Sequence, residues 1–246
     1  MTSEFKSHSS YREFAFSVRR WRYMRTPEDD TFIETVLKTS RGKTQEVPAG
    51  ETLWRAQIGY ALRELNDDHV EVAFGATRMK PPADWLIEGR APEGRINPKG
   101  IPFLYAATDT KTAIAEVRPS LGALVSVAQL RISRAIRLVN CTTDEGKIRN
   151  IIYSKEPEGE KRTLAVWRDI DRAFSEPVTD SDDHADYATT QLIAELFRKN
   201  GFDGIAYRSA LGQGHNIALF DLNAADVAPA TQLVEVTGLC LKYSCR

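Results

Sequence analysis

The chain has 246 residues, of which 42% are hydrophobic and 27% charged, and this balance is typical of a globular protein with a buried core. Its 33 lysines and arginines nearly match its 34 aspartates and glutamates, so the net charge of −1 argues against a nucleic-acid-binding protein. No apolar run approaches the roughly 18 residues that a membrane span needs.

The N-terminus and the cysteines favour a cytoplasmic protein. The first ten residues, MTSEFKSHSS, are polar and lack the apolar region of a secretory signal. Cys141 lies in an apolar run and is interpreted as a small buried side chain. Cys240 and Cys245 are near enough in sequence to pair, but the odd number of cysteines without CxxC spacing favours a reduced protein.

Residues 11–38 predict two helices that break at Thr26-Pro27. Ile33, Val36 and Leu37 have helical spacing, and a proline fits the first turn of a helix. The next segment, RGKTQEVPAG, is typical of a linker. We therefore predict a helical N-terminal extension over residues 1–47 and a second domain over residues 48–246.

From Glu51 onward, short strands separated by loops are predicted. The candidate strands are enriched in β-branched residues and lie at residues 53–59, 102–107, 121–132 and 134–142. Between the first two strands, residues 80–100 form a loop rich in proline and glycine. A structureless stretch of this length in a compact domain favours a binding loop.

The last third predicts two helices followed by two strands. The helices lie at residues 158–174 and 187–201, and the strands at 204–210 and 216–222. The second helix is amphipathic, and Gly201 is its predicted end. Because the elements do not alternate regularly, they predict an α+β fold with a curved, largely antiparallel sheet.

Residues 104–119, LYAATDTKTAIAEVRP, predict a strand followed by a short capped helix that carries Glu116 near its end. On that helix Ala113, Ile114 and Val117 share one face, and Glu116 lies on its border, about 60° beyond Ala113. This pattern by itself favours a solvated flank over a catalytic carboxylate.

Two other patterns resemble functional sites but are better explained as loops. The clusters Asp67-Asp68-His69 and Asp182-Asp183-His184 lack the histidine pairs and cysteines of a zinc site. The segment LGQGHN lacks the strand-to-helix context and the third glycine of a dinucleotide-binding loop. We therefore expect neither a bound metal nor a resident cofactor.

Four residues together indicate a nucleotide substrate: Arg55 in an apolar strand, Tyr105, Glu116 and Ser209. An arginine in apolar surroundings needs an anionic partner, and guanidinium binds phosphate oxygens in pairs. A tyrosine ring can stack on a cationic ring such as nicotinamide. Glycosidases normally use two carboxylates, but a cationic nicotinamide leaves without being protonated, so one carboxylate suits NAD.

At these residues the sequence resembles the RES-domain family, which is named for its arginine, glutamate and serine. The matching segments run in family order over about residues 51–222. They are LWRA (Arg55), GRINPKGIPFLYAATDTKTAIAEVRP (Arg95, Asn97, Tyr105, Glu116), DYATTQLIAELFRKNGFDGIAYRS (Ser209) and GHNIALFD (Asn216).

The resemblance implies an ADP-ribosyltransferase-like fold, in which a split antiparallel sheet holds NAD in a cleft. Family members are toxins of bacterial toxin–antitoxin pairs that degrade NAD. Some do so by phosphorolysis to nicotinamide and ADP-ribose 1″-phosphate, and others have been assigned protein ADP-ribosylation. The usual partner is an Xre-type antitoxin whose C-terminal part blocks the cleft, and any DNA binding belongs to that antitoxin.

The resemblance also implies roles for single residues. Arg55 would bind the phosphates of NAD, Glu116 would act at the nicotinamide ribose, and Tyr105 would pack on the nicotinamide end. Ser209 would orient the ribose or the incoming phosphate. Arg95 is a candidate either for a second anion or for a salt bridge that orders its loop.

Three further candidates complete the predicted NAD site, namely Asn97, Asn216 and Tyr60. Some family members have an aromatic residue directly after the first arginine, whereas this chain has Ala56, and Tyr60 is the candidate substitute. The N-terminal extension lies outside the resemblance. It is expected to pack on the core or to form a homodimer, and an inhibitory segment is the third alternative.

Three hypotheses for function follow. The first is an NAD phosphorylase or glycohydrolase that acts as a toxin, with inorganic phosphate as the expected co-substrate. The second is transfer of ADP-ribose to a protein or nucleic acid. The third is an NAD-binding module without turnover, which the presence of Arg55, Glu116 and Ser209 argues against.

Overall fold

The computed structural model describes residues 4–21, 24–64, 71–75, 79–81, 89–143, 155–176 and 187–240. These residues form an eight-stranded sheet and a separate hairpin. In spatial order the strands of the sheet are β1 (Thr44–Val47), β7 (Ile136–Asn140), β8 (Gly204–Arg208), β9 (His215–Leu219), β5 (Leu104–Ala107), β2 (Thr52–Ile58), β6 (Leu124–Ile132) and β10 (Ala225–Glu235). The hairpin pairs β3 (Ala61–Glu64) with β4 (Glu71–Gly75).

The sheet is antiparallel except at one position, where β7 and β8 run parallel. A parallel pair needs a long crossover, and this one contains two helices. The predicted fold class, α+β with a mainly antiparallel sheet, is confirmed.

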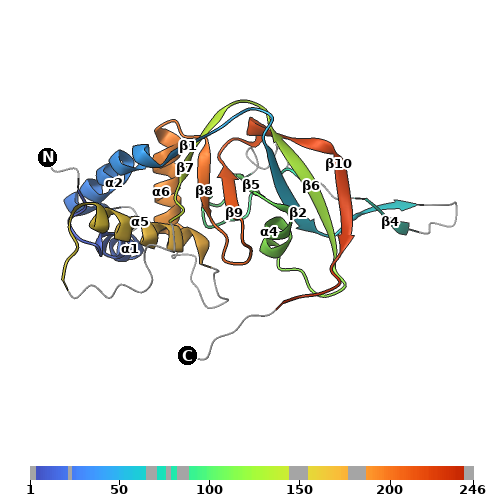
Figure 1. The fold of residues 1–246 in the computed structure, drawn as a ribbon, viewed down its shortest axis with the longest axis horizontal. Helices are drawn as coiled ribbons and strands as arrows, with labels where there is room; N and C mark the ends of the chain where they lie inside the picture. Colours follow the sequence, from blue (N-terminus) through green and yellow to red (C-terminus); the bar gives the residue numbers. More distant parts are fainter. Residues whose placement is uncertain are drawn as a thin grey trace.

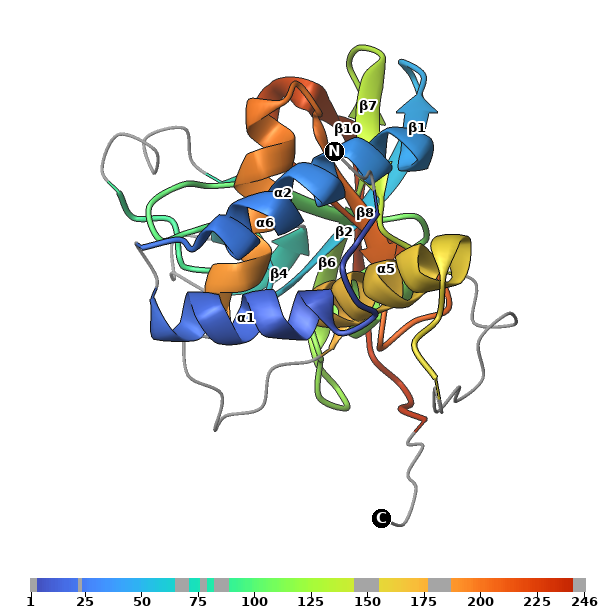
Figure 2. The ribbon, with the colours of Figure 1, turned by 90° about the vertical axis from the view of Figure 1, so that its left-hand side faces the viewer.

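Five α-helices accompany the sheet in the part of the chain that the structure describes: α1 (Ser10–Arg20), α2 (Pro27–Ser40), α4 (Thr110–Glu116), α5 (Gly159–Ser175) and α6 (Tyr187–Lys199). Four of them gather at the end of the sheet formed by β1, β7 and β8 (Figures 1 and 2). The short α4 lies apart from them, beside β2 and β5, and the β3–β4 hairpin projects from the opposite end (Figure 1). The helical layer and the hairpin therefore lie at opposite ends of the sheet.

The two N-terminal helices break where the sequence predicts. Pro27 is the first residue of α2, a position where its missing N–H costs no hydrogen bond. The Thr26 hydroxyl accepts a hydrogen bond from the Asp29 amide, and the Asp29 carboxylate accepts one from the Thr26 amide. This capping box defines the start of α2.

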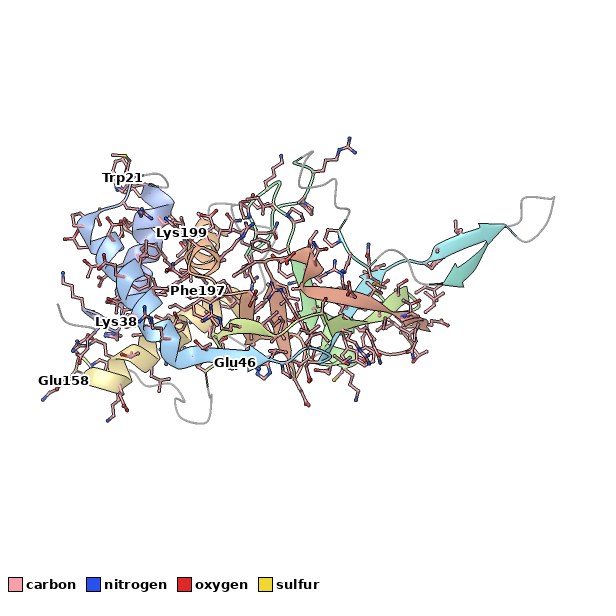
Figure 3. The ribbon with its side chains drawn as sticks, turned by 90° about the horizontal axis from the view of Figure 1, so that it is seen from above. Trp21, Lys38, Glu46, Glu158, Phe197 and Lys199 are labelled. Carbon is pink, nitrogen blue, oxygen red and sulfur yellow. The ribbon has the colours of Figure 1, made fainter. Side chains whose placement is uncertain are left out.

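The N-terminal helices share their core with α5, α6 and the sheet. The rings of Phe14 and Phe32 stack at 4.6 Å, and both side chains are buried. Phe197 of α6, labelled in Figure 3, is fully buried, and its ring stacks with that of Trp167 of α5 at 6.4 Å between centroids. Both N-terminal helices thus pack on the core, while the domain boundary at residue 47 stays a prediction.

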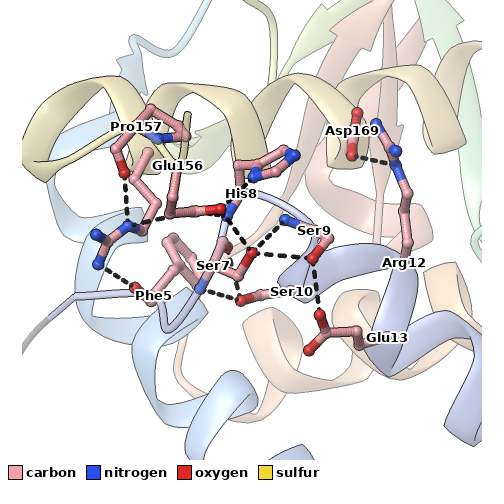
Figure 4. Close-up of polar contacts among 11 residues, drawn as sticks. Phe5, Ser7, His8, Ser9, Ser10, Arg12, Glu13, Glu156, Pro157 and Asp169 are labelled. Atoms are coloured by element: carbon pink, nitrogen blue, oxygen red, sulfur yellow. Dashed lines mark hydrogen bonds and ion pairs between the residues drawn. The ribbon is translucent and has the colours of Figure 1, made fainter. Parts of the chain in front are cut away.

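Polar contacts hold the first residues of the chain against the segment that enters α5 (Figure 4). The Glu156 carboxylate accepts a hydrogen bond from the His8 amide at 2.7 Å, and its other oxygen lies 2.6 Å from His8 Nδ1. Arg162 donates to the Phe5 carbonyl at 3.0 Å. One turn of α1 further on, Arg12 Nε donates to the Asp169 carboxylate of α5 at 3.1 Å. The N-terminal helices are therefore anchored along the length of α5.

The structure corrects the predicted linker over residues 41–50. Residues 41–43 form a 3-10 turn, and β1 follows as an edge strand that pairs with β7. The four-residue strand has too short a pattern to be recognised, and its pairing is supplied by a strand some 90 residues further along the chain.

Three more strands escaped the sequence analysis: β3, β4 and β10. The last carries Pro229, which lies where the pairing of β10 with β6 shifts register. Proline is tolerated on an edge strand or at a bulge, and β10 is both an edge strand and irregular at that position. The proline therefore obscured the longest strand of the sheet.

Several predicted features lie outside the described residues, namely both DDH clusters and Cys245. Of the predicted binding loop, residues 82–88 also lie outside them, and residues 89–100 have no helix or strand. Cys141 is buried, as expected, and Cys240 is exposed. None of the described helices is long and apolar enough to cross a membrane.

Candidate active site

A cavity of about 390 Å³ opens between the central strands of the sheet, α4 and the C-terminal end of α5. Its polar lining includes three arginines, a glutamate and an asparagine, and its walls combine five aromatic side chains with small aliphatic ones. The polar and aromatic side chains of the lining belong to Trp54, Arg55, Arg95, Tyr105, Glu116, Arg118, Phe174, Ser175, Tyr187, Tyr207 and Asn216. The sequence segments that predict a nucleotide site thus converge on one cavity.

Arg55 enters the cavity from β2, in the interior of the sheet. Its Nη1 donates to the Tyr105 carbonyl of β5 at 2.6 Å. Its Nε atom is buried and has no hydrogen-bond partner among the described residues. Burial lowers the pKa of this guanidinium, and the nearby Tyr105 opposes that shift only in part. A buried cation with an unused donor is suited to an anionic ligand.

Glu116 lies at the C-terminal end of α4, a helix of seven residues that begins at the N-cap Asp109. One carboxylate oxygen, Oε1, accepts two hydrogen bonds, from Ser209 Oγ at 2.6 Å and from Asn216 Nδ2 at 2.8 Å. Both donors are nearly fully buried. The carboxylate is therefore held through one oxygen, and these two side chains leave Oε2 available.

The Ser209 hydroxyl has its hydrogen bonds fixed by its own turn. It accepts from the amides of Leu211 at 3.1 Å and Gly212 at 2.8 Å, so its single proton is directed to Glu116. This arrangement makes Ser209 a positioning group for the carboxylate. A direct contact of Ser209 with ribose or phosphate stays a prediction.

The loop after Ser209 is closed onto the start of α4. The Gly214 amide donates to Thr112 Oγ1 at 3.0 Å, and the same hydroxyl donates to Asp109 at 2.7 Å. A Cβ atom on Gly214 would overlap the Asp109 carboxylate, and one on Gly212 would overlap Thr112. Glycine is therefore required in LGQGH for close packing against α4.

Tyr105 and Arg95 connect the cavity to the loop at residues 89–100. The Tyr105 hydroxyl donates to Asn97 Oδ1 at 2.6 Å, and burial raises the pKa of this tyrosine. Arg95 Nη1 donates to the Phe174 carbonyl near the end of α5 at 2.6 Å. Arg95 thus orders the loop through a carbonyl oxygen while it also lines the cavity.

The comparison with protein families decides what kind of domain holds this cavity. A model described as the RES domain matches residues 52–237, about three quarters of the chain. The chain belongs to the RES domain family. No curated protein sequence matches it.

Among solved structures, the RES domain described here is similar to a chain in the crystal structure of the M. tuberculosis MbcT-MbcA toxin-antitoxin complex. The two share 13% identity with a TM-score of 0.45, and the alignment covers 81% of this chain and 92% of the other. A likeness at this level carries no argument about function.

The structure brings Arg55, Glu116 and Ser209 together, although they lie far apart in sequence. Asn216 joins them directly. Asn97 is buried and does not line the cavity, but it reaches the site through the Tyr105 hydroxyl.

One predicted residue of the RES domain lies elsewhere. Tyr60 is 43% exposed, just beyond the end of β2, and does not line the cavity. Ala56 does line the cavity beside Arg55, but it supplies no aromatic ring. The aromatic side chain next to Arg55 is Trp54, which does line the cavity.

Sequence reasoning also missed Phe174, Tyr187, Tyr207 and Arg118. The first two lie at helix ends that only the tertiary fold brings to the cavity. Arg118, in contrast, had a signal in the motif EVRP. It has a φ of 47°, a left-handed conformation that is unfavourable for arginine and ends α4 directly after Glu116.

No group of three or more histidine, cysteine, aspartate or glutamate side chains able to hold a metal ion occurs within the described residues of this RES domain.

Proposed function

We propose that this RES domain cleaves the nicotinamide–ribose bond of NAD and transfers the ADP-ribose group to inorganic phosphate. The observation that carries the proposal is the buried, unpartnered Nε of Arg55, among the described residues, in the same cavity as the tethered carboxylate of Glu116. The first requires an anion and the second favours a developing positive charge. NAD carries a pyrophosphate and, on bond cleavage, a cationic ribose, so it meets both requirements.

Glu116 would stabilise the transition state through the oxygen that Ser209 and Asn216 leave available. When the bond breaks, its electron pair moves to the nicotinamide nitrogen, and nicotinamide leaves as a neutral molecule. Positive charge then develops on the ribose, where a fixed carboxylate is most effective. No general acid is needed, in agreement with a cavity lined by one carboxylate among the residues that the structure describes.

A phosphate oxygen would then attack the ribose carbon, which gives ADP-ribose 1″-phosphate. The arginines of the cavity support phosphate as the acceptor, because Arg95 and Arg118 provide positive charge in addition to Arg55. The aromatic walls, Trp54 and Tyr207 among them, favour flat rings and limit access of water.

We further infer that this activity makes the protein a toxin and that an antitoxin, of the Xre type in the family that the sequence resembles, blocks the cavity. Depletion of NAD stops growth because the coenzyme serves many essential reactions. The family membership supports this proposal.

The enzymatic proposal is tested by incubating the purified protein with NAD in phosphate buffer and in a phosphate-free buffer, and by separating the products chromatographically. We expect nicotinamide and ADP-ribose 1″-phosphate with phosphate and little turnover without it. Equal nicotinamide release in both buffers, with free ADP-ribose, would mean hydrolysis. Label from NAD on a macromolecule would mean ADP-ribosyl transfer, and no nicotinamide release would overturn the proposal.

The toxin proposal is tested separately by induced expression in a bacterial host. We expect growth to stop together with a fall in cellular NAD, and we expect Glu116→Gln to restore both. Growth arrest that persists in the Glu116→Gln variant would contradict a mechanism through NAD.

A further inference from the structure

Asp171, on the last turns of α5, is a fully buried carboxylate that the mechanism above does not use. It accepts four hydrogen bonds. Oδ2 accepts from the amide of Thr143 at 3.1 Å and from its hydroxyl at 3.0 Å, and Oδ1 accepts from Ser175 Oγ and the Arg208 amide, both at 3.3 Å. A buried carboxylate is costly unless it is satisfied in this way, so its position is strictly determined.

The hydrogen bond to Asp171 satisfies an amide of β8, that of Arg208, which lies beyond the end of the pairing with β7. The parallel pairing of β7 with β8 ends at Asn140 and Ala206, and the Ala206 carbonyl accepts from the amide of Cys141. Because alternate residues of a strand direct their backbone groups to the same side, the Arg208 N–H also faces the side of β7. β7 has ended there, and the Asp171 carboxylate takes this N–H instead.

Arg208 directly precedes Ser209, so this bond fixes the point at which the chain leaves the sheet for the loop that holds Glu116. From there Ser209 binds Glu116, and the turn from Leu211 to Gly212 binds Ser209. Ser175, which also donates to Asp171, lines the cavity. One buried side chain therefore connects the end of β8, the end of α5 and the segment after β7.

We propose that Asp171 is a positioning residue for catalysis, which sets the place of Ser209 and through it the orientation of the Glu116 carboxylate. The inference rests on the proposed function, since Glu116 is assigned there to the transition state. Asp171 itself touches no substrate, because it is covered completely.

The chain offers a matched control on the same helix. Asp169, two residues earlier, is also buried, but it accepts from Arg12 of α1 and faces the N-terminal helices. Asp171→Asn and Asp169→Asn each remove one buried negative charge from α5. Only the first alters the support of Ser209.

The test measures nicotinamide release against NAD concentration for the wild type and both variants, together with their melting temperatures. We expect Asp171→Asn to lower kcat on the order of 10- to 100-fold, as misplacement of a reacting group does, with KM for NAD changed less than about twofold. Asp169→Asn should keep the wild-type kcat even where its melting temperature falls as much. Equal kcat in the two variants, or a loss entirely in KM, would overturn the inference.

Amide hydrogen exchange separates this inference from the proposed function. The Leu211 and Gly212 amides, which donate to Ser209, should exchange about tenfold faster in Asp171→Asn and unchanged in Asp169→Asn. If the wild type does not cleave NAD, the proposed function fails and the exchange rates still decide the role of Asp171.

A second variant covers the case in which Asp171→Asn does not fold. Thr143→Val, which removes one hydrogen-bond donor to Asp171, should show the same changes in kcat and exchange on a smaller scale. Unchanged kcat and exchange in that variant would overturn the inference.

Discussion

The N-terminal helices and the cavity differ in how their buried polar groups are satisfied. In the helical part, Asp29 and Thr26 bind each other's amides, and Asp169 takes Arg12 as its partner. In the cavity, by contrast, the Nε of Arg55 has no partner among the described residues. The first region uses its polar groups for stability, and the second keeps one available for a ligand.

This difference predicts which substitutions should change stability without activity, and which should change activity without stability. Removal of a satisfied group leaves its partner unsatisfied and destabilises the fold. Removal of a buried charge with an unused hydrogen-bond donor removes a desolvation penalty, so it should not destabilise the fold in the same way. The two regions should therefore respond to substitution in opposite ways.

The largest effect is expected from Glu116→Gln. This change keeps the shape of the side chain and removes the charge that, under the proposed function, would stabilise the cationic ribose, so we expect kcat for NAD cleavage to fall on the order of 100- to 1000-fold. Because the introduced glutamine would keep an oxygen for Ser209 and Asn216, the melting temperature should stay the same. Initial rates and thermal unfolding check both points, and activity near the wild-type level would refute the assignment of Glu116.

The next largest effect is expected from Arg55→Met, which should lower activity and leave stability nearly unchanged. Loss of a charge-assisted contact to phosphate should raise KM for NAD about tenfold or more. The melting temperature should change little, because removal of a largely desolvated cation with an unused donor offsets the lost hydrogen bond to the Tyr105 carbonyl. Arg131→Met, which changes an exposed arginine on β6, is the control and should leave KM unchanged. A clear loss of stability in Arg55→Met would break the contrast between the two regions.

Thr26→Ala should do the reverse, because it acts on stability alone. Loss of the capping box costs about 1 kcal/mol, which lowers the melting temperature by about 2–4 °C in a chain of this size. Activity per folded molecule should not change. Thr31→Ala, in the same helix but outside the cap, should stay within about 0.5 kcal/mol of the wild type by denaturant unfolding. A fall in kcat for Thr26→Ala would show that the N-terminal helices influence the cavity.

The smallest effect, a pH-dependent change in melting temperature, is expected from Asp109→Asn. Asp109 caps the helix that carries Glu116. Burial disfavours its charge, but hydrogen bonds from the amide and hydroxyl of Thr112 outweigh this and hold its pKa below the ordinary value. Its contribution to stability is therefore complete above the pKa of the unfolded chain and is lost as the pH falls through the lower, folded value. Between about pH 6 and about pH 3, the wild type should lose its advantage in melting temperature over Asp109→Asn. A constant difference across this range would contradict the shift.

The structure brings the predicted residues Arg55, Glu116 and Ser209 together, and their roles stay predictions. Each lies in a segment that carries a motif of the RES-domain family, and the segments run in family order. Phe174 and Tyr187 were not predicted, since they reach the cavity only through the ends of α5 and α6. For Glu116 the helical pattern favoured an ordinary surface charge. Its two hydrogen bonds come from residues about 100 positions away, which no local pattern contains.

The reach of local sequence patterns also explains which strands were not predicted. The helices and the central strands were predicted because their periodicity or composition is clear within a few residues. β1 is too short for such a pattern, and β10 is interrupted by Pro229. Tyr60 was the candidate substitute for the aromatic residue that some family members have after the first arginine, whereas β2 ends at Ile58 and Tyr60 is exposed.

The distance in sequence between Glu116 and its two donors also sets the order of events during synthesis. The helix that carries Glu116 has seven residues and is too short to be stable alone, and both of its tethers lie beyond residue 208. A ribosome must therefore release nearly the whole chain before the carboxylate acquires its orientation. Under the proposed function, a growing chain would leave the NAD pool of its cell intact, and a chain that ends before Asn216 would lack one of the two groups that hold Glu116.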